Sequence, residues 1–431
     1  MNRITKHYQV HKPEILKQQI VHWLNQFTVC CFFDSNHYQQ SLSNFQLIAA
    51  AGVLTDTSAI TQLMRLDDWL VEHNDWIFGH LSFSLKNQIF SSPNIKSSQL
   101  ATVPFPDFYF FQPEVVCTLQ EKTFTIHSAL SHPDSIYEQI TEINLHACTP
   151  SLTNISFQPN ISKTKYYKTV ELLLNEIQKG NCYEINFCTE WIAKEAHISP
   201  AETYLALSAL SPMPFSAYYK LNSMHLMCAS PERYLCKQNN HLYSSPIKGT
   251  IARDLSNPEA DKKLQQTLLQ SKKERSENIM IVDLVRNDLS QICKSGTVKV
   301  TELCEIYSYP QVHQMISTIT GELKQQTPFS EILKATFPMG SMTGAPKEKV
   351  LSLTKQYENF SRGLYSGSVG YFTPEKDFDF NVVIRSLQYN AANTTLSYAV
   401  GSGITAQSNP EQEYEECLLK ATAMANLFIK N

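Results

Sequence analysis

The sequence lacks a surplus of basic residues, because 40 Asp and Glu outnumber 36 Lys and Arg and give a formal net charge of −4. Nucleic-acid-binding domains usually carry a basic surplus, so we expect no nucleic-acid partner. The chain also lacks a run of about 20 apolar residues, and its first residues contain no apolar signal-peptide core. We therefore expect no membrane contact and a cytoplasmic location.

The 11 cysteines include no C-x-x-C pair. This pattern indicates neither a zinc site nor a disulfide framework, so we expect reduced thiols in the core. In contrast, apolar material is plentiful, since 42% of the residues are hydrophobic and only 18% are charged. Such a composition predicts a compact globular protein rather than a disordered one.

A stretch rich in Pro, Ser, Thr and Asn over 149–164 predicts a connector. It divides an N-terminal region, 1–150, from a motif-rich region, 165–431. Hydrophobic periodicity in the second region predicts, among others, helices over 166–179, 200–209, 258–293 and 410–428, and strands over 182–191, 225–236, 379–389 and 395–401. Strand runs broken by helices predict an α+β fold with largely antiparallel sheets covered by helices.

Two expected helices carry carboxylates three residues apart, which places each pair on one helix face. Glu274 and Glu277 form one pair, and Glu413 and Glu416 form the other. Each pair alone is equally typical of a solvated helix face. Together they are able to hold Mg²⁺, which needs few carboxylates and completes its shell with water and substrate.

Several residues are candidates for binding an anion. Thr343 and Gly344 lie in a Gly-rich turn before an expected helix, where backbone N–H groups suit a carboxylate, although a purely structural turn is the alternative. Gly401 and Gly403 follow a strand and allow close approach to the backbone. Arg385 ends an apolar strand pattern, and its planar guanidinium matches a carboxylate.

Three residues are candidates for acid–base or nucleophilic chemistry. Lys248 lies between an apolar strand and a glycine, where burial would favour the neutral amine and make it a nucleophile; a surface lysine at a turn is the alternative. Glu232 follows Ser-Pro at a strand start and is able to serve as a general acid or base, or merely to occupy a turn. His313 is either a core or an active-site histidine.

In this order, these motifs resemble the chorismate-utilising enzyme family, whose members make aminodeoxychorismate, anthranilate, isochorismate or salicylate. The matching stretches are SPERYL (230–235), PIKGTIARD (246–254), ERSENIMIVDLVRNDLSQIC (274–293), VHQMIST (312–318), FPMGSMTGAPKEKV (337–350), RGLYSGSVGYF (362–372), DFNVVIRS (379–386) and GSGITAQSNPEQEYEECLLKA (401–421). The resemblance implies two large antiparallel sheets packed as a sandwich, with helices outside and the active site in a cleft.

The resemblance also assigns roles to residues. Glu277 and Glu416 are implied as Mg²⁺ ligands, with Glu274 and Glu413 behind them or acting through water. The ring carboxylate of chorismate is expected near the metal, Thr343, Gly344 and Lys420. The carboxylate of the enolpyruvyl arm is expected near Arg385, Tyr365, Gly401 and Gly403. His313 matches the family's active-site histidine, and Asn409 replaces an aspartate of the family while remaining able to cap the last helix.

Lys248 distinguishes between the family's activities. Members that make anthranilate or isochorismate have alanine at this position of P-I-x-G-T, whereas the aminodeoxychorismate synthases carry lysine. Isochorismate and salicylate synthases activate water with another lysine, and Glu184 stands in its place here. The resemblance thus favours amination of chorismate at C4, with Lys248 adding at C2 and Glu232 protonating the leaving hydroxyl.

Two alternatives and one partner follow from this interpretation. Anthranilate synthesis, or an isochorismate-type reaction, is the nearest alternative, and a catalytically silent chorismate-binding subunit is a more distant one. Because the sequence has no glutaminase triad in a nucleophile elbow, we expect a separate glutamine amidotransferase subunit to supply ammonia. In the N-terminal third, Asp34-Ser35 and 76–79 resemble the family's tryptophan-binding lobe only faintly, so tryptophan binding stays open.

Overall fold

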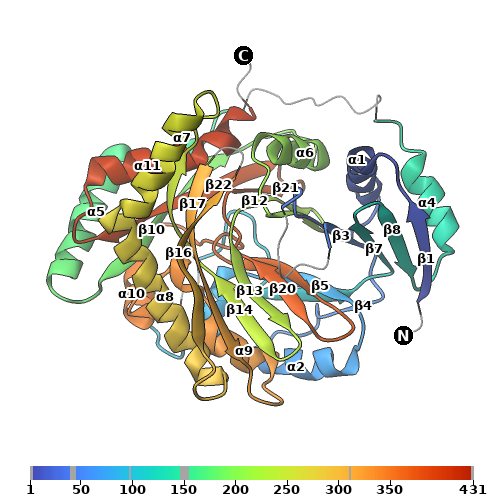
Figure 1. Cartoon of the computed structure of the whole chain (residues 1–431), viewed down its shortest axis with the longest axis horizontal. Helices are drawn as coiled ribbons and strands as arrows, with labels where there is room; N and C mark the ends of the chain where they lie inside the picture. The colour runs from blue at the N-terminus through green and yellow to red at the C-terminus, as the bar shows by residue number, and fades with distance from the viewer. Residues whose placement is uncertain (1–2, 39–44, 97–98, 146–154, 310–311, 429–431) are drawn as a thin grey trace.

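The computed structural model describes residues 3–38, 45–96, 99–145, 155–309 and 312–428 (Figure 1). The first residues of the predicted connector, 149–154, lie outside these ranges. Within them, no helix combines the length and the apolar character needed to cross a membrane.

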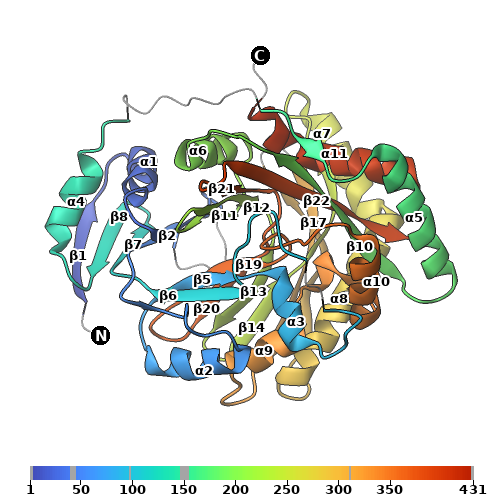
Figure 2. The ribbon, with the colours of Figure 1, turned by 180° about the vertical axis from the view of Figure 1, so that it is seen from behind.

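Two antiparallel sheets form the framework (Figures 1 and 2). The first has 12 strands, in the order β1 (Ile4–Gln9), β8 (Thr123–Ser128), β7 (Val115–Gln120), β3 (Leu47–Ala51), β2 (Val29–Asp34), β11 (Phe215–Leu221), β12 (Met224–Ser230), β21 (Ser386–Asn390), β22 (Thr395–Thr405), β10 (Glu184–Ala193) and β18 (Gly344–Ala345), with β9 (Gln158–Pro159) also beside β10. The second has 10 strands, in the order β15 (Ile247–Ala252), β17 (Val312–Glu322), β14 (His241–Ser245), β13 (Arg233–Gln238), β20 (Phe378–Asn381), β19 (Ser368–Phe372), β5 (Ile77–Leu81), β6 (Phe108–Gln112) and β4 (Thr55–Asp56), with β16 (Lys299–Ser308) also beside β17. Both sheets contain strands from before and after residue 150.

Helices accompany both sheets. They are α1 (Pro13–Leu24), α2 (Leu63–Glu72), α3 (Lys86–Ile89), α4 (Pro133–Thr141), α5 (Lys163–Gln178), α6 (Pro200–Leu210), α7 (Pro258–Gln270), α8 (Lys272–Ile292), α9 (Phe329–Thr336), α10 (Lys347–Tyr357) and α11 (Pro410–Asn426), with short 3₁₀ turns η1 (Phe83–Leu85) and η3 (Gly340–Met342). The first third therefore contains more helix than the sequence pattern predicted, since α1, α2 and α4 span 12, 10 and 9 residues.

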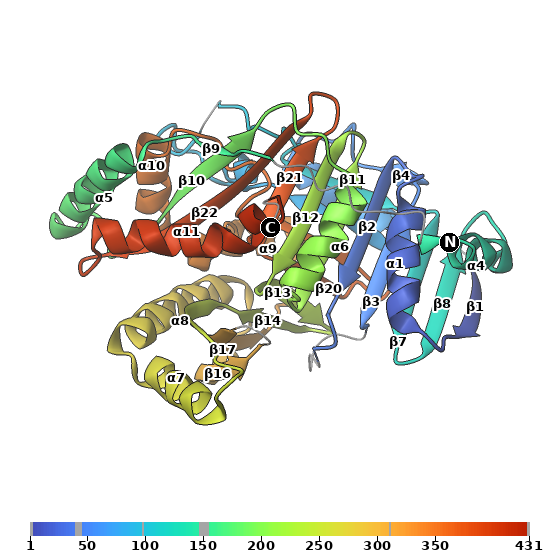
Figure 3. The same ribbon diagram turned by 90° about the horizontal axis from the view of Figure 1, so that it is seen from above.

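The sheets pack face to face, and helices cover their other faces. Cys31 of β2, Phe78 of β5 and Val369 of β19 share one buried cluster between the sheets. A second cluster joins the first sheet to α1, α5, α6 and α11, and a third joins the second sheet to α2, α8 and α9. Figure 3 shows α1, α6 and α11 over the first sheet, and α7 and α8 beside β16 and β17. The predicted α+β fold with two large antiparallel sheets is confirmed.

The chain passes from one sheet to the other twice at the same place. β12 of the first sheet runs into β13 of the second, and β20 of the second runs into β21 of the first. Hydrogen bonds join the two crossings: Val382 N–H donates to the Glu232 carbonyl (3.0 Å), and Ala229 N–H donates to the Arg385 carbonyl (3.0 Å). The Ser230 hydroxyl also donates to the Val382 carbonyl at 2.6 Å. The crossings therefore fix Glu232 and Arg385 close to each other.

The same crossings correct two strand predictions. The pattern over 225–236 predicted one strand, but Pro231 has no N–H to continue the ladder, and the chain changes sheet there. The pattern over 379–389 also predicted one strand, but the chain leaves the second sheet after β20, and Arg385 takes a positive φ of 49°. An unbroken apolar pattern does not tell which sheet each half joins.

Side-chain caps decide where the acidic helices begin. The predicted helix over 258–293 is two helices, because Ser271 interrupts it and its side chain accepts from the Glu274 N–H at 3.3 Å, which starts α8. Asn409 caps α11 by accepting from two N–H groups of its first turn, as its sequence position predicted. The caps fix where α8 and α11 begin, whereas their buried faces, which include Ile281 and Val285 of α8 and Cys417 and Ala421 of α11, set the direction of their carboxylates.

A buried ion pair ties strand β10 to the loops around it. Arg362 binds both carboxylate oxygens of Glu358, at 2.6 and 2.9 Å, and also donates to the carbonyls of Met342 (2.7 Å) and Asn186 (2.9 Å). Glu358 in turn accepts from the Cys188 N–H at 2.9 Å. Asn186 and Cys188 lie on β10, Met342 lies on η3, and Glu358 directly follows α10, so the network holds these elements relative to one another.

We expect Arg362→Ala to lower the free energy of unfolding by about 3–5 kcal/mol, because it leaves the Glu358 carboxylate buried without its cation. Urea denaturation followed by circular dichroism measures this change. Asp283→Asn is the matched control, since it removes the exposed ion pair with Arg286 on α8 and should cost less than about 1 kcal/mol. Equal losses in the two variants would contradict the assigned role of Arg362.

Candidate functional site

Lys248 and Glu184 form an ion pair that connects the two sheets. Lys248 lies on β15 of the second sheet, and its Nζ contacts Oε1 of Glu184 at the start of β10 in the first sheet. Only 12% of the Lys248 side chain and 1% of the Glu184 side chain are exposed. A buried amine is thus held against a buried carboxylate inside the protein.

The expectation that burial leaves Lys248 neutral is wrong for this structure. Burial acts to lower the pKa of Lys248, but the charges of Glu184 and Glu277 outweigh burial and raise the pKa above its ordinary value. Lys248 is therefore an ammonium group at rest. An amine nucleophile requires that another group first remove a proton from it.

Glycine at two positions makes room for this pair. A Cβ at Gly403 would lie 2.7 Å from Oε1 of Glu184 and 2.9 Å from Nζ of Lys248. Gly344 has a φ of +135°, and a Cβ there would lie 2.1 Å from the Glu184 carbonyl oxygen. Any side chain at either position would displace β10 or the ion pair.

The carboxylates of α8 and α11 meet beside this pair. Lys273 Nζ lies 4.0 Å from Oε1 of Glu277 and 3.8 Å from Oε1 of Glu413. Among the described residues, Glu277 Oε1 and Glu413 Oε2 are buried without a hydrogen-bond partner. Burial raises the pKa of Glu277 to about 7, although the charge of Lys248 opposes it, and burial also raises the pKa of Glu274.

Glu416 and Lys420 pair on the next turn of α11. Their Nζ–Oε1 distance is 2.7 Å, and Lys420 also donates to the Gly401 carbonyl at 3.0 Å. Burial acts to raise the pKa of Glu416, but the charges of Lys420 and Lys273 outweigh burial and lower it. Since 41% of the Glu416 side chain is exposed, its carboxylate is accessible from solvent.

These carboxylates suit a hard divalent cation. In the ranges that the structure describes, no three His, Cys, Asp or Glu side chains are arranged to hold a metal ion by themselves. Mg²⁺ does not require such a cage, because water and substrate oxygens complete its shell. Glu277 Oε1 and Glu413 Oε2, which accept no hydrogen bond from the described residues, are the oxygens that would bind such an ion.

The two sheet crossings add an acid and a cation. Glu232 is buried, and burial raises its pKa to about 7, although the charge of Lys248 opposes the shift. Arg385 makes no side-chain hydrogen bond or ion pair with any residue that the structure describes, and burial lowers its pKa. A largely buried guanidinium without a partner is a group that an anion would satisfy.

Thr343 and Tyr365 belong to the packing around β10. The Thr343 carbonyl accepts from the Asn186 N–H at 2.8 Å, and the Thr343 hydroxyl donates to the Met339 carbonyl at 3.0 Å. Tyr365 is buried, which raises its pKa well above the ordinary value, and its hydroxyl lies 4.0 Å from Cys188 Sγ. Neither is hydrogen-bonded to Lys248 in the described part of the chain, and their contact with substrate stays a prediction.

The structure does not join His313 to the other predicted site residues. Its ring nitrogens lie 2.8 Å from the Ser308 hydroxyl and 3.0 Å from Asp261 of α7. Adjacent residues of a strand point to opposite faces, so Gln314 points away from α7. The side-chain oxygen of Gln314 is buried and has no hydrogen-bond partner among the described residues. The alternation of side chains along the strand over V-H-Q (312–314) is the sequence signal that identifies Gln314 as a further candidate site residue.

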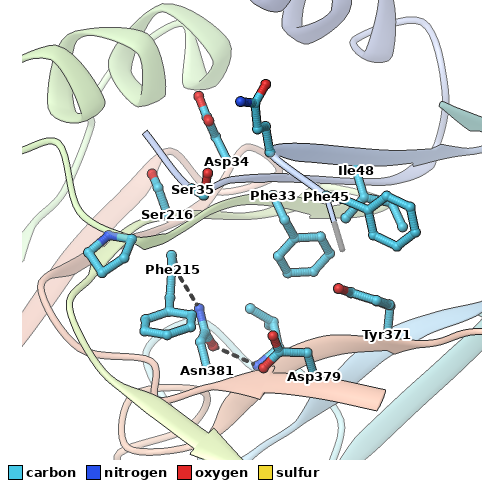
Figure 4. A pocket seen from close by; sticks show the side chains of 13 residues that line it. Phe33, Asp34, Ser35, Phe45, Ile48, Phe215, Ser216, Tyr371, Asp379 and Asn381 are labelled. Atoms are coloured by element: carbon cyan, nitrogen blue, oxygen red, sulfur yellow. Dashed lines mark hydrogen bonds between the residues drawn. The ribbon is translucent and has the colours of Figure 1, made fainter. Parts of the chain in front are cut away.

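A separate small cavity lies between the sheets (Figure 4). Its volume is about 40 Å³, and its lining includes Phe33 and Asp34 of β2 with Tyr371, Asp379 and Asn381 from the second sheet. None of the predicted catalytic residues lines it. This cavity and the cluster around Lys248 are therefore different places in the fold.

Known proteins with similar sequences support the assignment of the motifs. The chain matches the family described as chorismate binding enzyme over residues 30–426. It is 42% identical over 279 residues to the chloroplastic aminodeoxychorismate synthase of Arabidopsis thaliana, covering 64% of this chain and 30% of that protein. It is 34% identical over 283 residues to aminodeoxychorismate synthase component 1 of Salmonella typhimurium, covering 66% of this chain and 62% of that protein. The match thus spans less than two thirds of these relatives' length.

Solved structures show the same fold. The menaquinone-specific isochorismate synthase of Escherichia coli has a TM-score of 0.76 at 18% identity, covering 99% of this chain and 95% of that one. Anthranilate synthase component I of Streptococcus pneumoniae has a TM-score of 0.70 at 24% identity, covering 81% of this chain and 80% of that one. With the family match over most of its length, the chain belongs to the chorismate binding enzyme family.

Proposed function

We propose that this protein converts chorismate and ammonia to 4-amino-4-deoxychorismate. The observation that carries the proposal is the position of Lys248, a buried amine in contact with Glu184 and close enough to Glu232 and Glu277 for their charges to interact. A nucleophile and an acid within one cluster are what displacement of a hydroxyl requires. The identity to proteins named aminodeoxychorismate synthase supports the same activity.

The chemistry divides into two displacements. In the first, the Lys248 amine adds at C2, the ring double bond shifts, and the C4–O bond breaks as Glu232 protonates the hydroxyl, which leaves as water. In the second, ammonia adds at C4, the double bond returns, and the bond between C2 and Lys248 breaks. A pKa of about 7 keeps a large part of Glu232 protonated near neutral pH, as a general acid needs.

Chorismate carries two carboxylates, and the cluster offers cations for both. We assign the enolpyruvyl carboxylate to the unpartnered Arg385, with Tyr365, Gly401 and Gly403 near it, and the ring carboxylate to Lys420, Thr343 and Gly344. The Lys420 amine already bonds a carbonyl of β22, so it is held in place before substrate arrives. His313 stays the predicted active-site histidine, held by Asp261.

We assign Mg²⁺ to Glu277 and Glu416, with Glu274 and Glu413 behind them or acting through water. When bound, the ion would neutralise the ring carboxylate and draw electron density from the ring. The raised pKa of Glu277 and its Oε1, which accepts no hydrogen bond from the described residues, support this assignment, because a cation would stabilise the charged form of the carboxylate.

Ammonia needs a source. The Salmonella relative is named component 1, which implies a second component. We propose a glutamine amidotransferase subunit as that partner, with ammonium salts able to replace it in vitro. The division into an N-terminal region over 1–150 and a chorismate-binding region over 165–431, and a cytoplasmic location, stay predictions.

The first test identifies the product. Purified protein is incubated with chorismate, Mg²⁺ and ammonium at alkaline pH, and the products are analysed by mass spectrometry. We expect an amine that retains the enolpyruvyl group, and a loss of about 10²-fold or more in Lys248→Ala because the C2 nucleophile is gone. Lys263→Ala, on exposed α7, is the matched control and should keep full activity. Anthranilate with pyruvate as products would contradict the proposal.

A second test concerns the metal. Chelation should abolish turnover, and added Mg²⁺ should restore it. In Glu277→Gln we expect the Mg²⁺ concentration for half-maximal activity to rise by about tenfold or more, because one anionic ligand is lost. Asp283→Asn, on the exposed side of the same helix, should leave the Mg²⁺ requirement unchanged. An unchanged requirement in Glu277→Gln would remove this residue from the metal site.

A further inference from the structure

Glu184 is a buried carboxylate to which the proposed mechanism assigns no role. Its Oε1 contacts Lys248 Nζ, and its Oε2 is buried with no hydrogen-bond partner in the described residues. The side chain is 1% exposed, so water does not replace the missing partner freely. Burying a carboxylate costs more free energy than burying an apolar or amide side chain. A purely structural role at this strand start would therefore be better filled by one of those side chains.

Lys248 is the cation with which Glu184 interacts, although other charged groups lie nearby. Glu274 and Glu277 of α8 lie near the pair, as do Glu416 and Lys420 of α11. Lys273 lies among these carboxylates. Glu232 approaches Lys248 from the sheet crossing. The only ion pair of Glu184 in the described part of the chain is with Lys248. Gly403 keeps the contact open by having no side chain against it.

Resting on the proposed function, we propose that Glu184 is the base that takes a proton from Lys248 before the amine attacks C2, and that returns it when Lys248 leaves. Lys248 is an ammonium group at rest, so its nitrogen has no free electron pair until a proton moves. Glu184 Oε1 already contacts Lys248 Nζ, so the proton transfer needs no base from solvent.

The protons balance over the whole cycle. The Lys248 ammonium gives one proton to Glu184, and its freed electron pair forms the bond to C2. Glu232 gives its proton to the departing hydroxyl, which leaves as water. After ammonia bonds to C4, the new ammonium group gives a proton to Glu232. When the C2–N bond breaks, its electron pair returns to Lys248, which recovers its proton from Glu184.

The other carboxylates suit this role less well. Glu232 must be protonated for the leaving hydroxyl, so it is unable to accept a proton in the same step. Glu277 acts on Lys248 through its charge, but no hydrogen bond or ion pair joins the two in the described residues. Glu184 is therefore the carboxylate in contact with the reacting nitrogen.

The test compares Glu184→Gln, Glu184→Asp and wild type with chorismate, Mg²⁺ and ammonium between pH 7 and 9. In Glu184→Gln we expect kcat to fall by about 10²-fold at pH 7 with the KM for chorismate within about twofold, because the base is lost and substrate contacts are kept. The deficit relative to wild type should narrow by about tenfold towards pH 9, since solvent then removes the proton. Taking this ratio cancels the titration of Glu232, which both proteins share.

Glu184→Asp keeps a carboxylate, so its kcat should exceed that of Glu184→Gln by at least about tenfold. Glu190→Gln is the matched control: Glu190 lies on the same strand, burial raises its pKa to about 7, and it bonds Thr102 instead of Lys248. It should keep wild-type kcat. Thermal unfolding of each variant checks that it is folded.

The outcomes separate the two proposals. If wild type makes the amine and Glu184→Gln matches it within about twofold across the pH range, Glu184 is not the base and the proposed function stands. A deficit that is equal at pH 7 and 9, or that Glu184→Asp does not relieve, assigns Glu184 to structure and also overturns the proposal. If wild type makes no amine, the proposed function itself fails.

Discussion

The double crossing between the two sheets is the constraint on which the rest of the site depends. Two segments, one between β12 and β13 and the other between β20 and β21, exchange sheets side by side and hydrogen-bond to each other. Each backbone compensates for the ladder bonds that the other lost, which lets both segments stay buried. Because Glu232 and Arg385 lie within these segments, a buried acid and a guanidinium without a side-chain partner among the described residues are both fixed to the framework of the sheets.

The charges of the site are consistent with this rigid framework. Lys248 faces several carboxylates, so it stays protonated although it is buried, while Glu232 and Glu277 both have pKa values raised to about 7 by burial. Glu232 is therefore partly protonated near neutral pH, as a general acid requires, while Lys248 keeps its proton until a base removes it. Under the proposed function, the two carboxylates of chorismate and a bound metal ion would supply the charges that the described residues leave uncompensated.

The sequence predicted the fold class and most elements because helix caps, hydrophobic periodicity and turn residues act locally. It did not predict the crossings, since the patterns over 225–236 and 379–389 are equally apolar on both sides of the break. Motif order led to the prediction of Lys248, Glu232 and the acidic helix faces as site residues. It was not enough for the contact between Lys248 and Glu184, which lie 64 residues apart and meet only when β15 and β10 are placed in facing sheets.

The most direct measurement is peptide mapping by mass spectrometry after rapid acid quench of the enzyme with chorismate and Mg²⁺, first without ammonia and then with it. We expect a chorismate-derived mass on the peptide that contains Lys248. This adduct should accumulate without ammonia and be converted to the free amine product when ammonia is added. Formation of the amine at the full rate with Lys248 unmodified at every quench time would contradict a covalent intermediate and leave direct attack by ammonia at C4.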